Sequence, residues 1–377
     1  MKIVIAPQAF KGCASAQVIA STIAAGVHRA FPNAHLILSP IADGGDDTLE
    51  ILLAAKSGMH HHSKICGARN EIKFVSWGAL TNAFPKTAII EAARVCGLAS
   101  LEKTYRNPLL TTTYGIGQLI NIALAQGYKK LFIGLGGSAT NDAGVGMAQA
   151  LGARFLDANG RELPQGGEAL IHLNTIDISK LNPLIKEAEI IAGCDVTNPL
   201  LGPNGTSMIF SAQKGASKQM TEQLEKSLEN FASVIKKEFA CDLSEIPYMG
   251  SCGGTAAALS IFCHAKLLSG AQWILNEIGF DRILENADLV ITGEGCIDLQ
   301  TASRKAPFVV AEVAKKYKVP VIAIAGTSGP GADSLKEKGM DAIFIVSPHS
   351  KVVPTNALQL LQKTAEKAVI DFFTKKN

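Results

Sequence analysis

The sequence predicts an α/β fold built on parallel strands that helices cover on both faces. Three observations predict it: short β-branched runs end in glycine or acidic clusters, amphipathic patterns separate several of these runs, and apolar residues make up 47% of a chain with 35 glycines. Parallel strands buried on both faces carry such continuous apolar runs. The expected strands are Lys2 to Ala6, His35 to Ile41, Lys130 to Leu135, Glu189 to Ala192, Asp288 to Thr292, Val319 to Ala325 and Asp341 to Val346.

Helices are expected between several of these strands. The first begins after Ser15, whose hydroxyl suits an N-cap, and apolar residues then recur at helical spacing up to Val27. The weakly polar stretch 253–275 predicts a buried helix and not a membrane span, because charged residues and glycine interrupt it. Three histidines at 60–62 follow Gly58, where a solvated loop is expected in preference to a metal site.

The length of the chain predicts two domains. Its 377 residues exceed the size, roughly 250 to 300 residues, at which one hydrophobic core usually stops growing. Three strand-like runs lie close together between residues 63 and 91, which predicts an antiparallel meander. We therefore expect a mixed α+β domain at residues 63–282, inserted into an α/β domain formed by residues 1–62 and 283–377.

Charge and cysteine usage exclude several classes of function. A net charge of +3, spread along the chain, gives no footprint for nucleic acid or an anionic membrane, so a small-molecule ligand is expected. Eight scattered cysteines without a CxxC pair predict reduced thiols and no zinc site. The apolar run at the start is too short for a signal peptide, which predicts a cytoplasmic protein.

The strongest candidate binding feature is Gly134-Leu135-Gly136-Gly137-Ser138-Ala139-Thr140-Asn141-Asp142, which follows a strand and opens a helix. Glycines let backbone amides approach an anion closely, and the hydroxyls add donors. Glycine at this position is also compatible with a simple tight turn, but the Ser-Ala-Thr-Asn-Asp continuation favours phosphate. The expected phosphate-binding residues are Gly136, Gly137, Ser138, Ala139, Thr140, Asn141 and Asp142.

Carboxylates follow four predicted strands. Asp43, Asp142 and Asp195 follow one strand each, and Glu294 and Asp298 follow the fourth, in glycine-containing segments where open α/β sheets bind ligands. Asp43 and Glu294 are the expected Mg²⁺ ligands, because clustered hard oxygens suit this ion. Asp195, with Asp298 as the second candidate, is expected to take a proton from a substrate hydroxyl. The neighbouring acidic pair at 46–47 is also explained by the preference of helix starts for negative charge.

Three lysines next to glycine or proline are candidate partners for phosphate oxygens: Lys11, Lys214 and Lys305. Each is also compatible with an ordinary solvated surface lysine. The chain has neither a Walker A sequence nor the HRD and DFG motifs of protein kinases, so a phosphate loop of another kind is expected.

Long motifs make the chain similar to the bacterial-type glycerate kinases. The motifs are IAPQAFKG, ADGGDDT, NPLLTTTYGIG, GLGGSATNDAGVGMAQALGARFLD, CDVTNPLLGPNG, FSAQKGA and ADLVITGEGCIDLQTASRKAP. The resemblance implies ATP and Mg²⁺, a flavodoxin-like doubly wound domain with an inserted second domain, and phosphorylation of glycerate in organic-acid catabolism, usually at the 2-hydroxyl to give 2-phosphoglycerate. We also expect Lys11 to take part in catalysis, and a homodimer is compatible with the resemblance.

Several positions depart from the family's pattern. Gln8 and Ala9 stand where Asp-Ser is usual, Cys296 stands where arginine is usual, and Arg304 replaces a glycine; the run 249–255 replaces one rich in glycine and alanine. These departures leave two alternatives open: a kinase of a related hydroxy-acid, and a non-catalytic regulatory homologue that binds nucleotide or hydroxy-acid. A Rossmann dinucleotide enzyme is disfavoured, because no GxGxxG follows the first strand.

Overall fold

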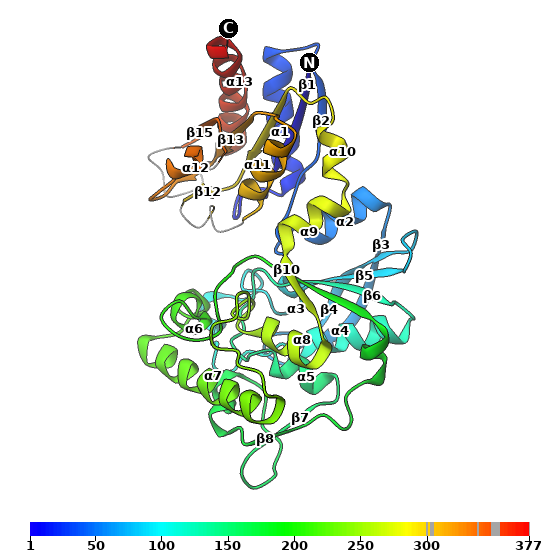
Figure 1. The fold of residues 1–377 in the computed structure, drawn as a ribbon. Helices are drawn as coiled ribbons and strands as arrows, with labels where there is room; N and C mark the ends of the chain where they lie inside the picture. Colours follow the sequence, from blue (N-terminus) through cyan, green and yellow to red (C-terminus); the bar gives the residue numbers. More distant parts are fainter. Residues whose placement is uncertain (299–300, 302–304, 338, 348–354, 377) are drawn as a thin grey trace. The chain divides into compact units, whose positions relative to one another are not determined.

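The protein is described from a computed structural model, which covers residues 1–298, 301, 305–337, 339–347 and 355–376 (Figure 1). Two compact units make up the chain: unit 1 is Met1–Asp43 with Ala271–Asn377, and unit 2 is Gly44–Gly270. The boundaries expected from the sequence lay at 62/63 and 282/283. Residues 44–62 belong with unit 2 because helix α2 (Thr48–Lys56) packs on that unit's sheet, and residues after 270 join the apolar core of unit 1.

Unit 1 is built on a five-stranded parallel sheet with the order β15-β13-β11-β1-β2. Counted along the unit's own strands this is the order 2-1-3-4-5 of flavodoxin-like folds, so the predicted fold class is confirmed. In such sheets ligands bind where the strand order reverses, which here is at the carboxyl ends of β1 and β11. The strands are β1 (Lys2–Pro7), β2 (His35–Leu38), β11 (Leu289–Gly293), β13 (Val321–Ala325) and β15 (Ala342–Ile345).

Helices cover both faces of this sheet. Ile3 and Ile5 pack in one apolar cluster with α1 and α13, whereas Val4 and Ala6 pack in another with α11, because successive side chains of a strand point to opposite faces. The predicted N-cap is confirmed: Ser15 Oγ accepts from Val18 N at 3.4 Å. The remaining elements of unit 1 are α1 (Ala16–Ala30), α9 (Gly270–Glu277, which starts at the unit boundary), α10 (Phe280–Leu284), β12 (Cys296–Ile297), α11 (Ala306–Lys316), β14 (Thr327–Ser328), α12 (Ser334–Glu337) and α13 (Ala357–Lys376).

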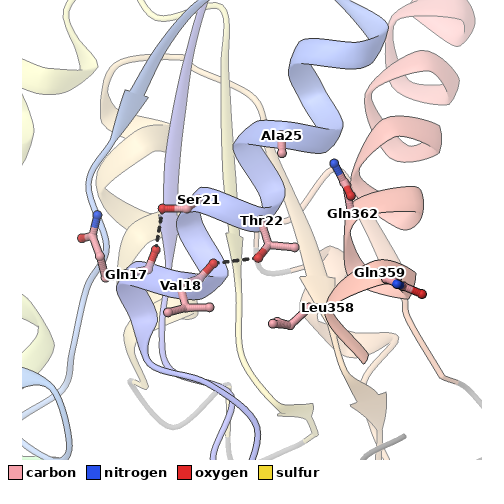
Figure 2. A pocket seen from close by; sticks show the side chains of 8 residues that line it. All are labelled: Gln17, Val18, Ser21, Thr22, Ala25, Leu358, Gln359 and Gln362. Carbon is pink, nitrogen blue, oxygen red and sulfur yellow. Dashed lines mark hydrogen bonds between the residues drawn. The ribbon is translucent and has the colours of Figure 1, made fainter. Parts of the chain in front are cut away.

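Helices α1 and α13 lie side by side and leave an open hollow of about 400 Å³ at one end of their contact (Figure 2). Gly26 allows the close approach of the two helices, since a Cβ there would lie 2.3 Å from Gln362 O. The hollow is lined by Gln17, Val18, Ser21, Thr22, Ala25, Leu358, Gln359 and Gln362.

Unit 2 is built on a six-stranded mixed sheet with the order β10-β9-β6-β5-β4-β3. The predicted meander is confirmed, because β3, β4 and β5 pair antiparallel, while β5, β6, β9 and β10 are parallel. The strands are β3 (Met59–Cys66), β4 (Ile72–Leu80), β5 (Thr87–Glu91), β6 (Lys130–Gly134), β9 (Glu189–Cys194) and β10 (Lys266–Ser269), with a separate pair β7 (Arg154–Leu156) and β8 (Thr175–Asp177).

Two local expectations in unit 2 are wrong. Residues 60–62 are not a loop but part of β3, where His61 stacks on Trp77 of β4 at a centroid distance of 4.7 Å. The stretch 253–275 is not one helix, because His264 takes a left-handed conformation (φ 50°) and the chain then adds β10 beside β9. At residues 60–62 pairing with the next strand, β4, overrides the local pattern, and at β10 pairing with the distant strand β9 does so.

Helices and one large apolar core complete unit 2. The core includes the fully buried Trp77, Phe155, Phe231 and Phe262. Within the described part of the chain, no helix is both long and apolar enough to cross a membrane. The helical segments are α2, α3 (Ala92–Cys96), η1 (Lys103–Tyr105), α4 (Tyr114–Ala125), α5 (Val145–Ala150), η2 (Gly167–His172), η3 (Pro183–Glu187), α6 (Thr206–Phe210), η4 (Ala212–Lys214), α7 (Lys218–Phe239) and α8 (Thr255–Cys263).

Candidate functional site

In unit 2 the loops that follow three strand ends pack tightly on one another through glycines. Gly136 N donates to Gly44 O at 3.1 Å, and a Cβ at Gly136 would lie only 2.5 Å from Gly45 Cα. A Cβ at Gly44 would likewise lie 2.5 Å from Gly193 O, at the end of β9. Only glycine permits this approach of backbone to backbone. Gly44 and Gly136 are therefore required for the packing of the loops on one another, and not only for tight turns.

The predicted base lies beside this pair of loops. Asp195 is the residue after β9, and its Oδ2 lies 3.2 Å from the position a Cβ would take at Gly136. Its side chain is half-buried. The structure thus brings together the predicted base and the predicted phosphate loop within one unit.

Lys214 is a buried cation held against the same loop. It ends η4 and is 3% exposed, and its Nζ donates to Ser138 Oγ at 3.3 Å and to Thr140 O at 2.7 Å. Burial lowers the pKa of its ammonium group, and the neighbouring thiols and carboxylates oppose that effect. A fixed positive charge beside glycine-rich backbone favours an anionic ligand.

Asp142, the last of the predicted phosphate-binding residues, is tied to the backbone of unit 2. Its fully buried carboxylate accepts from Thr113 N and Thr113 Oγ1, both at 2.8 Å, and from Gly144 N and Gly146 N at 3.1 and 3.3 Å. Burial raises its pKa, while these four donors act in the opposite direction. Asp142 therefore ties the loop to the starts of α4 and α5.

The neighbouring asparagine has an unsatisfied acceptor. Asn141 Nδ2 donates to Ser207 Oγ at 3.1 Å, but its buried Oδ1 has no hydrogen-bond partner among the described residues. A buried acceptor left unpaired costs about 1–3 kcal/mol, so this oxygen calls for a partner such as a ligand or a bound water.

Unit 1 holds a second group of predicted site residues at the end of β11. Glu294 Oε1 accepts from Thr301 Oγ1 at 2.5 Å, and Lys305 Nζ lies 3.7 Å from Glu294 Oε2. Burial raises the pKa of Glu294, and the charges of Asp43 and Asp298 raise it further, whereas Lys305 and Thr301 act to lower it. Three predicted acidic residues and one predicted lysine are thus electrostatically coupled at this strand end.

The carboxylates near the end of β11 are the candidate ligands for Mg²⁺ in unit 1. Among the described residues no group of three or more His, Cys, Asp or Glu side chains suited to a metal ion occurs. Mg²⁺ commonly uses only one or two carboxylates and completes its shell with water and phosphate oxygens. Asp43 and Glu294, each 7% exposed and mutually repelling, fit that smaller requirement.

The loop after β1 lies against the loop after β11. Gln8 N donates to Gly293 O at 2.8 Å, and a Cβ at Gly295 would lie 3.4 Å from Lys11 N. Lys11 is exposed, as is Cys296, whereas Gln8 is buried. Arg304, the other departure from the family pattern, lies outside the described residues.

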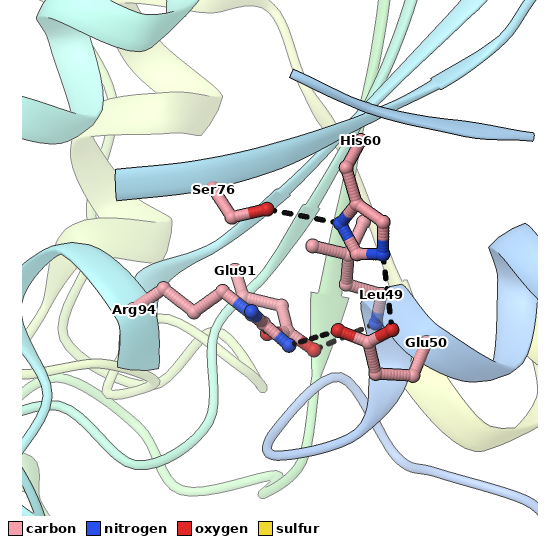
Figure 3. A network of polar contacts seen from close by, with 6 residues as sticks. All are labelled: Leu49, Glu50, His60, Ser76, Glu91 and Arg94. Atoms are coloured by element: carbon pink, nitrogen blue, oxygen red, sulfur yellow. Dashed lines mark hydrogen bonds and ion pairs between the residues drawn. The ribbon is translucent and has the colours of Figure 1, made fainter. Parts of the chain in front are cut away.

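Sequence reasoning missed the residue that fixes the start of α2. Asp47 is the N-cap of this helix but has positive φ (67°) and makes no side-chain cap bond. Glu91, 2% exposed at the end of β5, instead accepts from Leu49 N at 2.7 Å (Figure 3). A lone glutamate at the end of a buried apolar strand was the available signal.

Charged residues extend this contact outward from Glu91. Arg94 pairs with Glu91 through its Nε and with Glu50 Oε1 through its Nη2, the latter at 2.7 Å. Glu50 Oε2 lies 3.2 Å from His60 Nε2, and His60 Nδ1 lies 2.9 Å from Ser76 Oγ (Figure 3). The network ties α2 to β3, β4 and α3, and so fixes the loop that contacts Gly136.

Comparison with known proteins gives the family. A model of the glycerate kinase family matches residues 3–372. The chain belongs to the glycerate kinase family. It is 45% identical over 346 residues to a glycerate 2-kinase of Escherichia coli strain K12, covering 92% of this chain and 90% of the relative. It is 42% identical to a glycerate kinase of Halalkalibacterium halodurans, with the same coverage.

One solved structure matches the fold of the present protein along its whole length. A crystal structure assigned to glycerate kinase 2 from Salmonella typhimurium LT2 matches with a TM-score of 0.82 and 39% sequence identity, covering 100% of this chain and 99% of that one. As a member of this family the protein is a kinase.

Proposed function

We propose that the protein transfers the γ-phosphoryl group of ATP to the 2-hydroxyl group of glycerate, with Mg²⁺, giving 2-phosphoglycerate and ADP. The observation that carries the proposal is the arrangement in unit 2, where a buried lysine and a carboxylate stand beside a loop of close-packed glycines. Phosphoryl transfer requires groups of these kinds: fixed charge and amides for phosphate oxygens, and a base for the attacking hydroxyl.

In unit 2, the backbone amides of Gly137, Ser138 and Thr140 bind phosphate oxygens, because Gly136 N and Ala139 N already donate to Gly44 O and Cys96 O. Lys214 supplies the compensating charge. Asn141 Oδ1 accepts a hydrogen bond from the ligand, which its lack of a partner supports. Asp195 orients the substrate hydroxyl and accepts its proton. Asp142 acts on structure alone, since its oxygens already accept four hydrogen bonds.

In unit 1, Asp43 and Glu294 are the proposed Mg²⁺ ligands, and the ion would neutralise charge on the phosphate oxygens. The charge of Lys305 acts to lower the pKa of Glu294 against the effect of burial, which favours the ionised form that a metal ligand requires. Lys11 is a proposed contact to phosphate or to the substrate carboxylate, and Asp298 adds negative charge to the Mg²⁺ group.

The substrate proposal rests on the relatives. The Escherichia coli relative is named a glycerate 2-kinase and the others quoted are glycerate kinases, which supports glycerate and its 2-hydroxyl. We also propose a cytoplasmic location, because all eight cysteines are free thiols, and use of the product in organic-acid catabolism. A homodimer remains a prediction of the family resemblance.

A coupled assay for ADP with glycerate and MgATP tests the reaction, and phosphorus NMR of the product tests the position. A phosphate on C2 couples to one proton and gives a doublet, whereas a phosphate on C3 couples to two and gives a triplet. A doublet is expected. A triplet would overturn the 2-hydroxyl assignment, and absence of ADP formation across a panel of small hydroxy-acids would favour the non-catalytic alternative.

A further inference from the structure

One oxygen of the Glu294 carboxylate is already held by a hydroxyl group of unit 1. Thr301 Oγ1 donates to Glu294 Oε1 at 2.5 Å and accepts from Asp298 N at 3.1 Å. A hydroxyl group has a single hydrogen, and because Thr301 Oγ1 accepts from Asp298 N, that hydrogen is directed to Glu294. Thr301 is fully buried, which shields the contact from water. The oxygen of Glu294 that remains for another partner is therefore Oε2.

This second oxygen faces a lysine that is loosely held. Glu294 Oε2 lies 3.7 Å from Lys305 Nζ, and the side chain of Lys305 is 25% exposed. The distance is too long for a hydrogen bond, so the two groups attract each other as charges without a fixed geometry. Lys214 in unit 2 differs, because it is 3% exposed and donates to Thr140 O at 2.7 Å. Of these two lysines, Lys305 is the one whose ammonium group is the easier to displace.

The side chain of Lys305 is not needed to start the helix that follows it. Lys305 is the N-cap residue of α11 but makes no side-chain cap bond, and its backbone O accepts from Phe308 N and Val309 N, both at 3.1 Å. A proline in the first turn of α11 favours the helix start whatever the lysine side chain does. The ammonium group can therefore leave Glu294 while the backbone around it stays in place.

The charges around Glu294 call for a cation at Oε2. Burial raises the pKa of Glu294 and the charge of Lys305 opposes this effect, while Asp43 and Asp298 add repulsion. Either an ammonium group or a divalent ion can supply the positive charge that such a group of carboxylates needs. The two cations would repel each other if both stood at the same oxygen. Lys305 and a divalent ion are therefore alternative partners of Glu294 Oε2.

We propose that Lys305 is an exchangeable counter-ion of Glu294, which pairs with Oε2 in the absence of metal, gives up this oxygen to Mg²⁺ and then pairs with a phosphate oxygen of the nucleotide. No covalent bond changes in this exchange. Lys305 thereby makes tight binding of the nucleotide depend on the metal. The exchange at Oε2 rests on the proposed Mg²⁺ site, and the pairing with phosphate rests on the proposed phosphoryl transfer.

Metal binding without nucleotide tests the competition for Oε2. Mn²⁺ is the probe, because it takes the same kinds of oxygen ligand as Mg²⁺, and electron paramagnetic resonance measures its unbound fraction with the full-length protein. Lys305→Met removes the competing charge, so its Kd for Mn²⁺ should fall by about 10-fold or more. Lys316→Met, which changes an exposed lysine at the end of α11, should keep the wild-type Kd. An unchanged or higher Kd of Lys305→Met would overturn the proposal, as would the absence of Mn²⁺ binding by both proteins.

A double-mutant cycle shows whether the shared oxygen is the cause. Glu294→Gln should weaken Mn²⁺ binding, and adding Lys305→Met to that variant should bring little further gain, since the competition has no carboxylate left to act on. An equal gain with and without Glu294 would show a general effect of charge and would contradict the exchange. Wild-type Mn²⁺ binding by Glu294→Gln would overturn both the exchange and the proposed metal site.

Calorimetric titration with ATP tests the second half of the exchange. In Mg²⁺ that saturates the protein, Lys305→Met should bind ATP more weakly than the wild type, whereas in EDTA the two Kd values should agree, because Lys305 then stays with Glu294. Equal losses of affinity in both conditions would contradict the exchange. If Lys305→Met tightens Mn²⁺ binding but the wild type forms no ADP with any hydroxy-acid, the proposed function fails and the competition at Glu294 stands. ADP formation by the wild type together with an unchanged Mn²⁺ Kd of the variant has the opposite meaning.

Discussion

At the scale of single residues, the candidate site contains several buried charged groups, and each is compensated by different partners. Lys214 donates to loop atoms, Asp142 accepts from backbone amides, and Glu294 is paired with a lysine and a hydroxyl. A buried charge is costly unless it is paired and hydrogen-bonded. The hydrogen bonds that each charged side chain already makes indicate how much of its bonding capacity is left for a ligand.

Replacing the proposed base tests its role directly. Asp195→Asn keeps the size of the side chain beside Gly136 but cannot accept the proton, so turnover should fall by about 100-fold or more. The melting temperature should stay near that of the wild type, because Asp195 is only half-buried. Steady-state kinetics and thermal denaturation are the measurements, and unchanged turnover would remove Asp195 from the mechanism.

The raised pKa of Glu294 gives a pH dependence of stability. Because the folded-state pKa lies above the unfolded value of 4.5, protonated Glu294 favours the folded state at low pH, and this contribution is lost as the pH rises from 4.5 through the folded-state pKa. Glu294→Gln should therefore show a smaller loss of stability than the wild type over that interval, measured by urea unfolding. Added Mg²⁺ should reduce the difference by favouring the ionised carboxylate.

The exposed Glu312 of α11 provides the control for that experiment. Glu312→Gln should follow the wild-type pH profile. A Glu294→Gln profile that coincides with the wild type would contradict the shift.

At the scale of elements, the ends of strands and the starts of helices position the site. Helix α2 begins without a side-chain cap from Asp47, and Glu91 at the end of β5 supplies the missing acceptor. A residue on a strand thus fixes a helix and, through it, the loop that meets Gly136. Contacts of this kind make the position of one loop depend on several elements.

Removing Glu91 should therefore affect both stability and activity. Glu91→Ala leaves Leu49 N without its acceptor and Arg94 without its buried partner, for an expected cost of about 2–3 kcal/mol. Turnover should also fall, because the 44–48 loop loses its anchor. Glu50→Gln changes the exposed end of the same network and should cost less than about 1 kcal/mol. Equal effects of the two variants in urea unfolding would contradict the central place of Glu91.

At the scale of the whole molecule, two units with separate cores carry different parts of the proposed reaction. Every side chain of the large core of unit 2 comes from residues 44–270, and the two cores of unit 1 come from its two chain segments. The proposed phosphate-binding groups belong to unit 2, and the proposed Mg²⁺ ligands belong to unit 1. The effect of each ligand on stability can therefore be measured separately for each unit.

ATP alone should stabilise unit 2 most strongly. At a concentration of 100 times Kd a ligand adds about 2.7 kcal/mol to the stability of the state that binds it. Hydrogen exchange should slow at residues 134–142 and around Lys214 when ATP is added. Protection confined to unit 1 would contradict the assignment of the phosphate loop, and Lys218→Met, which changes an exposed lysine nearby, should leave the protection unchanged.

The features predictable from the sequence are those that depend on neighbours along the chain. Periodicity predicts the parallel strands and the helix after Ser15, and glycine spacing predicts the loop at 134–142, because side-chain alternation and turn conformation are local properties. The histidines of β3 and the strand β10 were missed because each is fixed by pairing with another strand: β3 with its neighbour β4, and β10 with the distant β9.

The sequence by itself thus determined the α/β fold, the glycine-rich loops and the resemblance to glycerate kinases, which residues 3–372 bear out. Only the tertiary structure decided that Lys214 is buried against Thr140, that Asp142 accepts from Thr113, and that Glu91 holds α2. The physical reason is that burial and hydrogen bonding depend on groups far apart in sequence: Lys214 and Thr140 are separated by 74 positions, and no pattern within a single loop specifies such a partner.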